Sequence, residues 1–212
     1  MNKNTDSIWL EVRGLQKKWP MKTIEIDFML DKGESLAILG RSGCGKSSVL
    51  RMIAGLLTPD SGEIFLDNIN LVPLHPSLRQ VGMVFQDHAL FTHLRVDDNI
   101  GYGLVSKGMS RKESRLAAAD WLTLFGLSGF GRRRIDSLSG GEKQRVALAR
   151  TLAPGPRLVL FDEPLSALDA DLRKRLQVEL KKYQKELGYT AIYVTHDEEE
   201  ASFLSNRILR ME

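Results

Sequence analysis

The chain has 212 residues, 42% of them hydrophobic and 27% charged, which is the ordinary composition of a globular domain with a substantial buried core. Its 30 basic and 27 acidic residues leave a net charge of +3, too small to indicate a nucleic-acid-binding surface. Cys44 is the only cysteine, so no disulfide forms within the chain and a reducing compartment is expected. There is no run of about eighteen apolar residues that would predict a membrane-spanning helix.

The first part of the chain is predicted to form short strands around one helix. Residues 24–28 alternate apolar and polar side chains, as a strand with one buried face does. An apolar strand is expected at 35–39, and a helix runs from Lys46 to Gly55, where the glycine ends it. Turn residues within 61–68 separate further short strands.

The middle of the chain is predicted to be helical. A buried strand is expected at 81–85, followed by helices at 111–125 and 142–152 with no strand between them. We therefore expect residues 87–153 to form a helical insertion that projects from the sheet.

The last part returns to strands. Buried strands are predicted at 157–161 and 191–194, separated by a long amphipathic helix whose apolar residues recur every three or four positions from Leu172 to Leu187. Another helix begins at Asp197. Buried strands that alternate with helices predict a mainly parallel sheet covered on both faces.

A glycine-rich loop connects the predicted strand at 35–39 to the helix after it, and its sequence is Gly40-Arg41-Ser42-Gly43-Cys44-Gly45-Lys46-Ser47. In this setting backbone N–H groups and the helix N-terminus bind phosphate. The ammonium of Lys46 can reach the β- and γ-phosphates, and the hydroxyl of Ser47 can ligate Mg²⁺. The alternative is a plain glycine turn, which does not account for Lys-Ser directly after the last glycine.

Polar side chains follow two later strands. Asp162 and Glu163 end a buried strand, the position at which ligands gather in open α/β sheets. Asp162 is predicted to hold Mg²⁺, and Glu163 to orient and deprotonate an attacking water. His196 follows the next strand and is predicted to contact the γ-phosphate or this water. The acidic run 197–200 is expected to be a solvent-exposed helix start.

Two further features have both a structural and a functional explanation. Ser139 and Glu142, three residues apart before a helix, form a capping-box pattern. Gly140 and Gly141 between them weaken a helix start and leave N–H groups open to an anion, so the same residues can also bind phosphate. Trp19 lies about twenty residues before the glycine loop, where it can stack on an adenine ring or simply pack.

In this order, the glycine loop, Gln86, the segment 138–142 and the Asp162-Glu163 pair resemble the nucleotide-binding subunit of ATP-binding cassette (ABC) transporters. The resemblance extends from Trp19 to a strand near Ile208. It implies an α/β P-loop NTPase (RecA-like) fold with a mainly parallel core, a small antiparallel β-subdomain and the helical subdomain at about 87–153. It also implies one domain covering 1–212 without a C-terminal regulatory domain.

The resemblance assigns each motif a role, and the residues that would bind ATP within one subunit are Trp19, Gly40, Arg41, Ser42, Gly43, Cys44, Gly45, Lys46, Ser47, Ser48 and Gln86. The Mg²⁺ ligands would be Ser47, Gln86 and Asp162. The catalytic residues would be Glu163, His196 and Lys46. The signature, which would close over the ATP of a partner subunit, is Leu138, Ser139, Gly140, Gly141 and Glu142. The D-loop would be Ser166, Ala167, Leu168 and Asp169.

The resemblance also implies cofactors and partners. These are ATP, Mg²⁺, a second copy of the chain, membrane-spanning permease subunits and a solute-binding protein, with no nucleic acid. The chain would lie peripherally at the cytoplasmic face of the cell membrane. The segment from Leu90 to Ile100 resembles the importer type, in which it meets a helix of the membrane subunit. Arg41 and Cys44 depart from the smaller residues common in the family, and alkylation of Cys44 is expected to block ATP hydrolysis.

Other classes share part of this pattern. Soluble cassette ATPases of DNA repair carry a long coiled coil before the signature, but only about fifty residues separate Gln86 from Leu138. Translation-type cassette proteins usually carry two cassettes in one chain. The signature and Glu163 argue against a P-loop kinase, and the filled catalytic positions argue against a non-catalytic subunit. The predicted function is therefore an ATPase that drives solute import.

Overall fold

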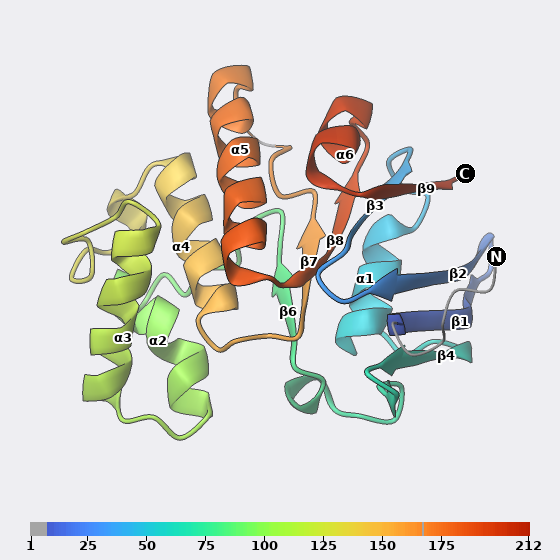
Figure 1. Cartoon of the computed structure of the whole chain (residues 1–212), viewed down its shortest axis with the longest axis horizontal. Helices are drawn as coiled ribbons and strands as arrows, with labels where there is room; N and C mark the ends of the chain where they lie inside the picture. Colours follow the sequence, from blue (N-terminus) through green and yellow to red (C-terminus); the bar gives the residue numbers. More distant parts are fainter. Residues whose placement is uncertain (1–7, 167) are drawn as a thin grey trace.

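The computed structural model describes residues 8–166 and 168–212, which form two sheets flanked by helices (Figure 1). One sheet has five strands in the order β6-β7-β8-β3-β9, and each neighbouring pair is parallel. Its strands are β3 (Ser35–Gly40), β6 (Val81–Val84), β7 (Leu158–Asp162), β8 (Thr190–Thr195) and β9 (Arg207–Met211). The other sheet is antiparallel, in the order β2-β1-β4-β5, and consists of β1 (Ile8–Trp19), β2 (Lys22–Asp31), β4 (Ser61–Leu66) and β5 (Ile69–Asn70).

Six α-helices lie in the described residues: α1 (Lys46–Ala54), α2 (Val96–Ser106), α3 (Arg111–Leu124), α4 (Gly140–Leu152), α5 (Ala170–Leu187) and α6 (Glu198–Leu204). Short 3₁₀ turns occur at η2 (Pro76–Leu78) and η3 (Ile135–Ser137). None of these helices combines the length and apolar character that crossing a membrane requires.

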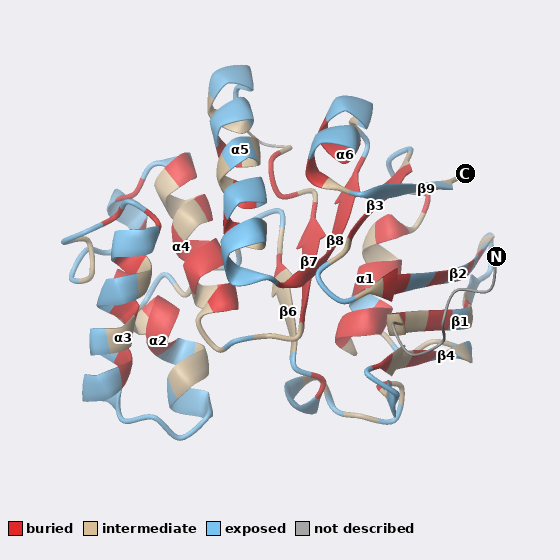
Figure 2. Cartoon of the chain, in the orientation of Figure 1, coloured by how far each residue is buried: buried red, intermediate tan, exposed pale blue. Residues whose placement is uncertain are grey.

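The inner strands β3, β7 and β8 are mainly apolar because both faces of the sheet are covered there, whereas the edge strand β9 carries the exposed Arg207 and Arg210. Every residue of β7 and of β8 is buried, and Figure 2 shows both strands in red. Side chains alternate between two cores, so that Ala37 and Leu39 point to one and Leu36 and Ile38 to the other. This confirms the predicted α/β class with a mainly parallel sheet.

Helix α1 lies between the two sheets (Figure 1). Its buried side chains, among them Val49, Leu50 and Ile53, pack in one cluster with residues of both sheets. Gly55 ends the helix in the left-handed conformation, with φ of 80°. Because α1 packs in this way, its N-terminus lies at the carboxyl end of β3, where the glycine loop leads into the helix.

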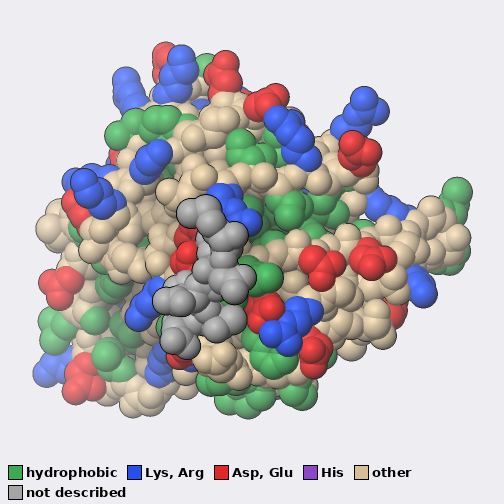
Figure 3. Space-filling view, turned by 45° about the vertical axis from the view of Figure 1, so that its right-hand side comes forward, with side chains coloured by type: hydrophobic (Ala, Val, Ile, Leu, Met, Phe, Trp, Pro, Cys, Tyr) green, Lys and Arg blue, Asp and Glu red, His purple; other side chains and the backbone are tan. Residues whose placement is uncertain are grey.

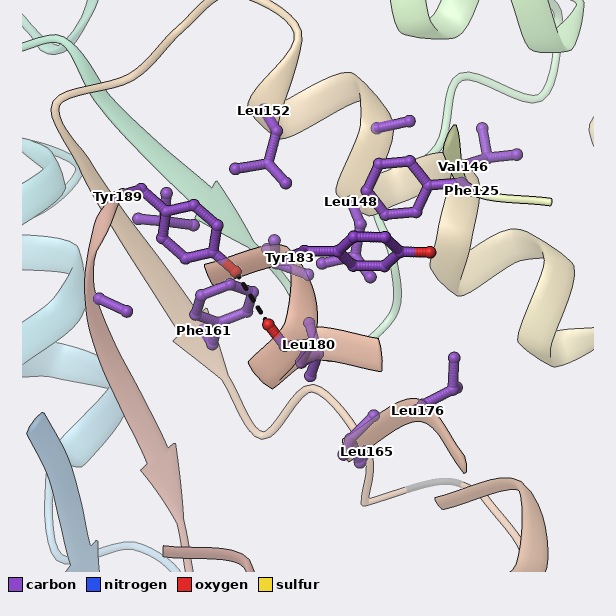
Figure 4. Packing of buried hydrophobic residues seen from close by; sticks show 14 of the residues in the cluster. Phe125, Val146, Leu148, Leu152, Phe161, Leu165, Leu176, Leu180, Tyr183 and Tyr189 are labelled. Atoms are coloured by element: carbon purple, nitrogen blue, oxygen red, sulfur yellow. Dashed lines mark hydrogen bonds between the residues drawn. The ribbon is translucent and has the colours of Figure 1, made fainter. Parts of the chain in front are cut away.

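The opposite face of the parallel sheet is covered by α4, α5 and α6. Aromatic rings join these layers: Phe125 and Tyr183 have ring centroids 4.2 Å apart, and Phe161 stacks on Tyr193 at 4.5 Å. Figure 4 shows this cluster, including the hydroxyl of Tyr189 that donates to the Leu180 carbonyl at 3.5 Å. The core therefore ties α5 to the strand that ends at Asp162.

Between β6 and β7 the described residues form α2, α3 and α4 and no named strand. The helical character predicted for this stretch agrees with the structure, while its standing as a subdomain spanning 87–153 within a single domain stays a prediction. Neither helix α2 nor strand β1 was predicted. The alternation of Leu10 and Val12 in β1 breaks at a register irregularity before Leu15, which hides the period of two.

Charge is distributed evenly over the surface that can be seen beside the antiparallel sheet. On the face shown in Figure 3, Lys and Arg side chains lie among Asp and Glu side chains outside the part that grey atoms cover. This distribution agrees with the small net charge of the sequence.

Candidate nucleotide site

The glycine loop joins the end of β3 to the start of α1 and requires two of its glycines. Gly43 and Gly45 have φ of 80° and 106°, values that residues with a side chain rarely adopt. A Cβ atom on Gly45 would lie 2.1 Å from Cδ1 of Ile24 on β2. Helix α1 then begins without any side-chain cap, so its first N–H groups remain open to an anion.

Lys46 is buried inside this loop, with 3% of its surface exposed. Its Nζ donates to the carbonyls of Gly40 at 2.8 Å and Arg41 at 3.0 Å, and lies 3.9 Å from Oε1 of Glu163. Because a buried ammonium needs partners, these bonds hold the side chain inside the loop. The loop thus contains a preformed positive centre that phosphate oxygens can engage.

Ser47 and Asp162 meet at the carboxyl edge of the sheet. The Ser47 hydroxyl donates to Oδ1 of Asp162 at 2.6 Å, and Asp162 is 7% exposed. Hydroxyl and carboxylate oxygens suit Mg²⁺. Across residues 8–166 and 168–212, however, no three His, Cys, Asp or Glu side chains gather into a metal cluster. A magnesium ion at this position would therefore need further oxygen ligands, for which the Gln86 amide, phosphate and water are the candidates.

Glu163 follows Asp162 but turns away from the strand, with φ of 45°, a left-handed value that is strained for a residue with a side chain. Its N–H donates to the Val194 carbonyl at 3.0 Å, which fixes this turn to β8. Its Oε2 lies 3.4 Å from Nδ1 of His196. The glutamate side chain is 16% exposed and the histidine 56%, so the pair sits at the rim of the site.

Gln86, just past β6, is connected to the same glutamate through Ser166. The Gln86 amide donates to the Ser166 hydroxyl at 3.1 Å, and this hydroxyl donates to the Glu163 carbonyl at 3.1 Å. Asp169 caps α5 by accepting from the Leu172 N–H at 3.0 Å. Ala167, the remaining residue of the predicted D-loop, lies outside the described residues.

The segment 138–142 forms the capping box that the sequence predicts. The Glu142 N–H donates to the Ser139 hydroxyl at 3.4 Å, and the Ser139 N–H donates to the Glu142 carboxylate at 2.7 Å. Gly141 has a packing reason as well, since a Cβ there would lie 3.2 Å from Cδ1 of Leu172. Gly140 lies next to Leu168, so the signature segment and the predicted D-loop are neighbours within one chain.

A cleft of about 460 Å³ opens beside the glycine loop, and it is lined by Leu39, Gly40, Arg41, Ser42, His196, Glu198 and Arg210. It brings the loop between β3 and α1 together with the residue that follows β8. Neighbouring parallel strands thus deliver their loops to one side of the sheet, as expected for a ligand site in such folds.

Comparison with known proteins identifies the family. A model described as ABC transporter matches residues 24–166. The chain belongs to the ABC transporter family. It is 48% identical over 187 residues to the Fe(3+) ions import ATP-binding protein FbpC 1 of Rhizobium meliloti, covering 88% of this chain and 53% of that protein.

Other relatives and solved structures agree with this assignment. A spermidine/putrescine import ATP-binding protein PotA of Clostridium acetobutylicum is 46% identical over 206 residues, covering 95% of this chain and 58% of the relative. The chain spans about half the length of the curated relatives it matches. A dimeric ATP-binding cassette solved in a post-hydrolysis state with ADP and phosphate superposes with a TM-score of 0.83, at 33% identity, covering 96% of this chain and 94% of that one.

The end of the β1–β2 hairpin reaches the glycine loop. Trp19 is the last residue of β1, is 39% exposed, and pairs across the turn with Lys22. Nζ of Lys22 donates to the Gly43 carbonyl at 2.5 Å. Sequence reasoning singled out Trp19 and missed Lys22, because only strand pairing reveals that the two are opposite each other.

The structure adds detail to one expectation about a single residue and corrects another. Cys44, predicted to lie beside the nucleotide and to be a target of alkylation, is only 8% exposed and its Sγ packs against Gly40, while its role at the nucleotide stays a prediction. The acidic run 197–200 was expected to be solvated, yet Glu200 is 4% exposed and accepts from the Thr195 hydroxyl at 2.7 Å. Burial raises the pKa of the Glu200 carboxyl, and the hydrogen bond from Thr195 opposes that rise. The helical spacing of Glu200 from Asp197, on the inner face of α6, is the signal that could have identified it.

Proposed function

We propose that this chain is the ATP-hydrolysing subunit of an ABC importer, in which two copies enclose ATP and drive transport through membrane-spanning permease subunits. The observation that carries the proposal is the convergence of four strand ends at one side of the sheet: Gln86 after β6, Asp162 and Glu163 at the end of β7, His196 after β8, and the loop 40–47 at the end of β3. ATP binding agrees with the family of the chain.

Nucleotide binding follows from the loop geometry. The N–H groups at the start of α1 would donate to the phosphates, and Lys46 would exchange its two loop carbonyls for β- and γ-phosphate oxygens. Trp19 would stack on the adenine. Ser48, Gly40 to Gly45 and the exposed Arg41 would complete the surface around the triphosphate.

Ser47, Asp162 and Gln86 would hold Mg²⁺ next to the phosphates. The Ser47–Asp162 bond already brings two oxygens together at this position. The ion supplies charge neutralisation of the β- and γ-phosphate oxygens when it is bound. Gln86 keeps contact with the Glu163 segment through Ser166, so it can respond to the occupied site.

Glu163 would accept a proton from the attacking water, and His196 would orient the γ-phosphate side of the site. The 3.4 Å separation of Oε2 and Nδ1 allows both side chains to contact one water or phosphate oxygen. General-base catalysis of this kind contributes roughly 10²- to 10⁴-fold. The Glu163 carboxylate lies near Lys46 and His196, whereas the Asp162 carboxylate accepts from Ser47, so the adjacent acids can perform different tasks.

The second copy would supply the signature. Ser139, the two glycines after it and the N-terminus of α4 would bind the γ-phosphate held by the other copy, flanked by Leu138 and Glu142. The D-loop residues Ser166 to Asp169 would lie at the same contact. A dimer is supported by the dimeric cassettes to which the chain is similar.

Import, the permease, a solute-binding protein and a peripheral place at the cytoplasmic membrane face are supported by the names of the relatives, which are import ATP-binding proteins. The segment from Leu90 to Ile100 would meet the permease. We further propose that the described helices between β6 and β7 form a subdomain of one cassette spanning 1–212. No nucleic-acid partner is part of this proposal.

The decisive experiment is Glu163→Gln, with Glu186→Gln on the exposed face of α5 as the matched control. The first variant should bind Mg·ATP, hydrolyse it at least about 100-fold more slowly, and accumulate as an ATP-bound dimer. The control should behave as wild type. Hydrolysis by Glu163→Gln at the wild-type rate, or a strictly monomeric variant at saturating Mg·ATP, contradicts the proposal. Co-purification with nucleic acid and no membrane protein would favour a soluble cassette ATPase instead.

A further inference from the structure

Arg173, in the first turns of α5, lies between two loops of the site. One terminal nitrogen of its guanidinium donates to the Leu168 carbonyl at 3.0 Å, and the other lies 3.8 Å from Oδ2 of Asp197. Leu168 belongs to the predicted D-loop, and Asp197 directly follows His196. A planar guanidinium with donors on two ends can hold two partners in a fixed relation.

These contacts complete a ring around Glu163. The Ser166 hydroxyl donates to the Glu163 carbonyl at 3.1 Å, and His196 lies 3.4 Å from the Glu163 carboxylate. Leu168 lies two residues after Ser166 in the chain, and its carbonyl accepts from Arg173. Arg173 also faces Asp197, which is covalently joined to His196. A displacement of the loop 166–169 therefore has a direct route to the histidine.

Asp197 is itself fixed by a second bond. Its Oδ1 accepts from the Glu200 N–H at 3.0 Å and so caps α6. The other carboxylate oxygen is the one that faces Arg173. Arg173 thus contacts a carboxylate that also caps α6 and that belongs to the residue directly after His196.

The cluster retains unused bonding capacity. Nε of Arg173 and Oε1 of Glu200 are both buried and have no hydrogen-bond partner. The positive charge of Arg173 also lowers the pKa of Glu200, against the rise caused by burial. Arg173 and Glu200 carry opposite charges, yet these two atoms are not paired with each other. The guanidinium is therefore held in place by packing and by its other contacts, and not by Glu200.

We propose that Arg173 is a positioning residue that couples Leu168 to His196, so that the histidine is aligned with Glu163 only while Leu168 keeps its position. The inference rests on the proposed ATPase function and deepens it. Since 166–169 is the loop expected at the dimer contact, Arg173 would pass the arrival of the second copy to the catalytic residues.

The test uses three variants and a control. Arg173→Met keeps the aliphatic stem and removes both contacts. Asp197→Asn keeps the cap of α6, because asparagine caps as well as aspartate, and removes the charge facing Arg173. The variant that carries both changes completes a double-mutant cycle. Arg175→Met, on the exposed side of the same helix, is the control.

Both single variants should lower kcat for ATP hydrolysis roughly tenfold, because a small misalignment of a reacting group is costly. The KM for ATP and the melting temperature should change little, since neither residue touches the glycine loop. The double variant should be no slower than Arg173→Met alone, because both changes break the same link. Arg173→Lys should recover part of the activity, and Arg175→Met should match wild type.

Amide hydrogen exchange gives a second measurement that does not depend on turnover. Arg173→Met should speed exchange at 195–198 and leave 40–47 unchanged. A kcat within twofold of wild type, additive effects in the double variant, or unchanged exchange at 195–198 would each overturn the inference. If wild type itself hydrolyses no ATP, the proposed function fails, and the exchange result still decides whether Arg173 positions His196.

Discussion

The Ser47 hydroxyl donates a 2.6 Å hydrogen bond to Oδ1 of Asp162, a residue 115 positions later in the chain. The bond joins the first residues of α1 to the end of β7, although α1 and β7 belong to different parts of the sequence. It places a hydroxyl oxygen and a carboxylate oxygen, the kinds of atom that suit Mg²⁺, beside the glycine loop.

Ser47→Ala should remove the magnesium dependence of ATP binding. Wild type is expected to bind ATP about tenfold more tightly with Mg²⁺ than with EDTA, whereas the variant should show nearly equal dissociation constants. Titration with a fluorescent ATP analogue under both conditions measures the difference. Retention of the full magnesium effect in Ser47→Ala would show that the hydroxyl is not a ligand.

Ser139→Ala separates capping from phosphate binding, because Ser110 heads an equivalent capping box at α3. Each serine-to-alanine change should cost about 1 kcal/mol of stability, or about 2–4 °C in melting temperature for a chain of this size. Only Ser139→Ala should also lose ATPase activity. Equal activity in the two variants would leave Ser139 with a structural role alone.

Cys44 should be protected from alkylation in the native protein. Its 8% exposure and the contact of Sγ with Gly40 predict labelling by iodoacetamide at least about tenfold slower than in urea-unfolded protein. Mg·ATP should slow labelling further because a bound nucleotide stabilises the loop. Mass spectrometry of timed samples gives the rates, and fast labelling that ignores nucleotide would contradict this placement.

Glu200→Gln should stabilise the protein at high pH. Burial raises the pKa of this carboxyl in the folded state, so the fold holds the proton more tightly than the unfolded chain does. Wild type therefore loses stability as pH rises from the ordinary carboxyl range through the raised pKa. Glutamine keeps an acceptor for the Thr195 hydroxyl and carries no charge.

The measurement is the melting temperature of both proteins between pH 5 and pH 8. The advantage of the variant should be greatest at pH 8 and shrink as the pH falls toward the ordinary pKa of a carboxyl. If the difference in melting temperature between the two proteins is the same at every pH, then the charge of the Glu200 carboxylate does not destabilise the fold.

Short-range patterns were sufficient for several parts of the site. The glycine loop, the capping box at Ser139 and the carboxylates after β7 were all predicted correctly in position relative to their elements, because each is written in fewer than ten consecutive residues. The buried strands were equally legible, since strands covered on both faces are apolar throughout. Helix α2 was not predicted because its glycines and its mixture of polar and apolar residues obscure the helical period.

By itself the sequence determined the fold class, the loops that follow the buried strands and the family. Only the tertiary structure decided which side chains meet: Lys22 with Gly43, Arg173 with Leu168 and Asp197, and Glu200 in the interior. The physical reason is that periodicity and turn chemistry act between neighbours in the chain. Pairing across strands and between helices depends instead on register and packing, which bring together residues that no local pattern connects.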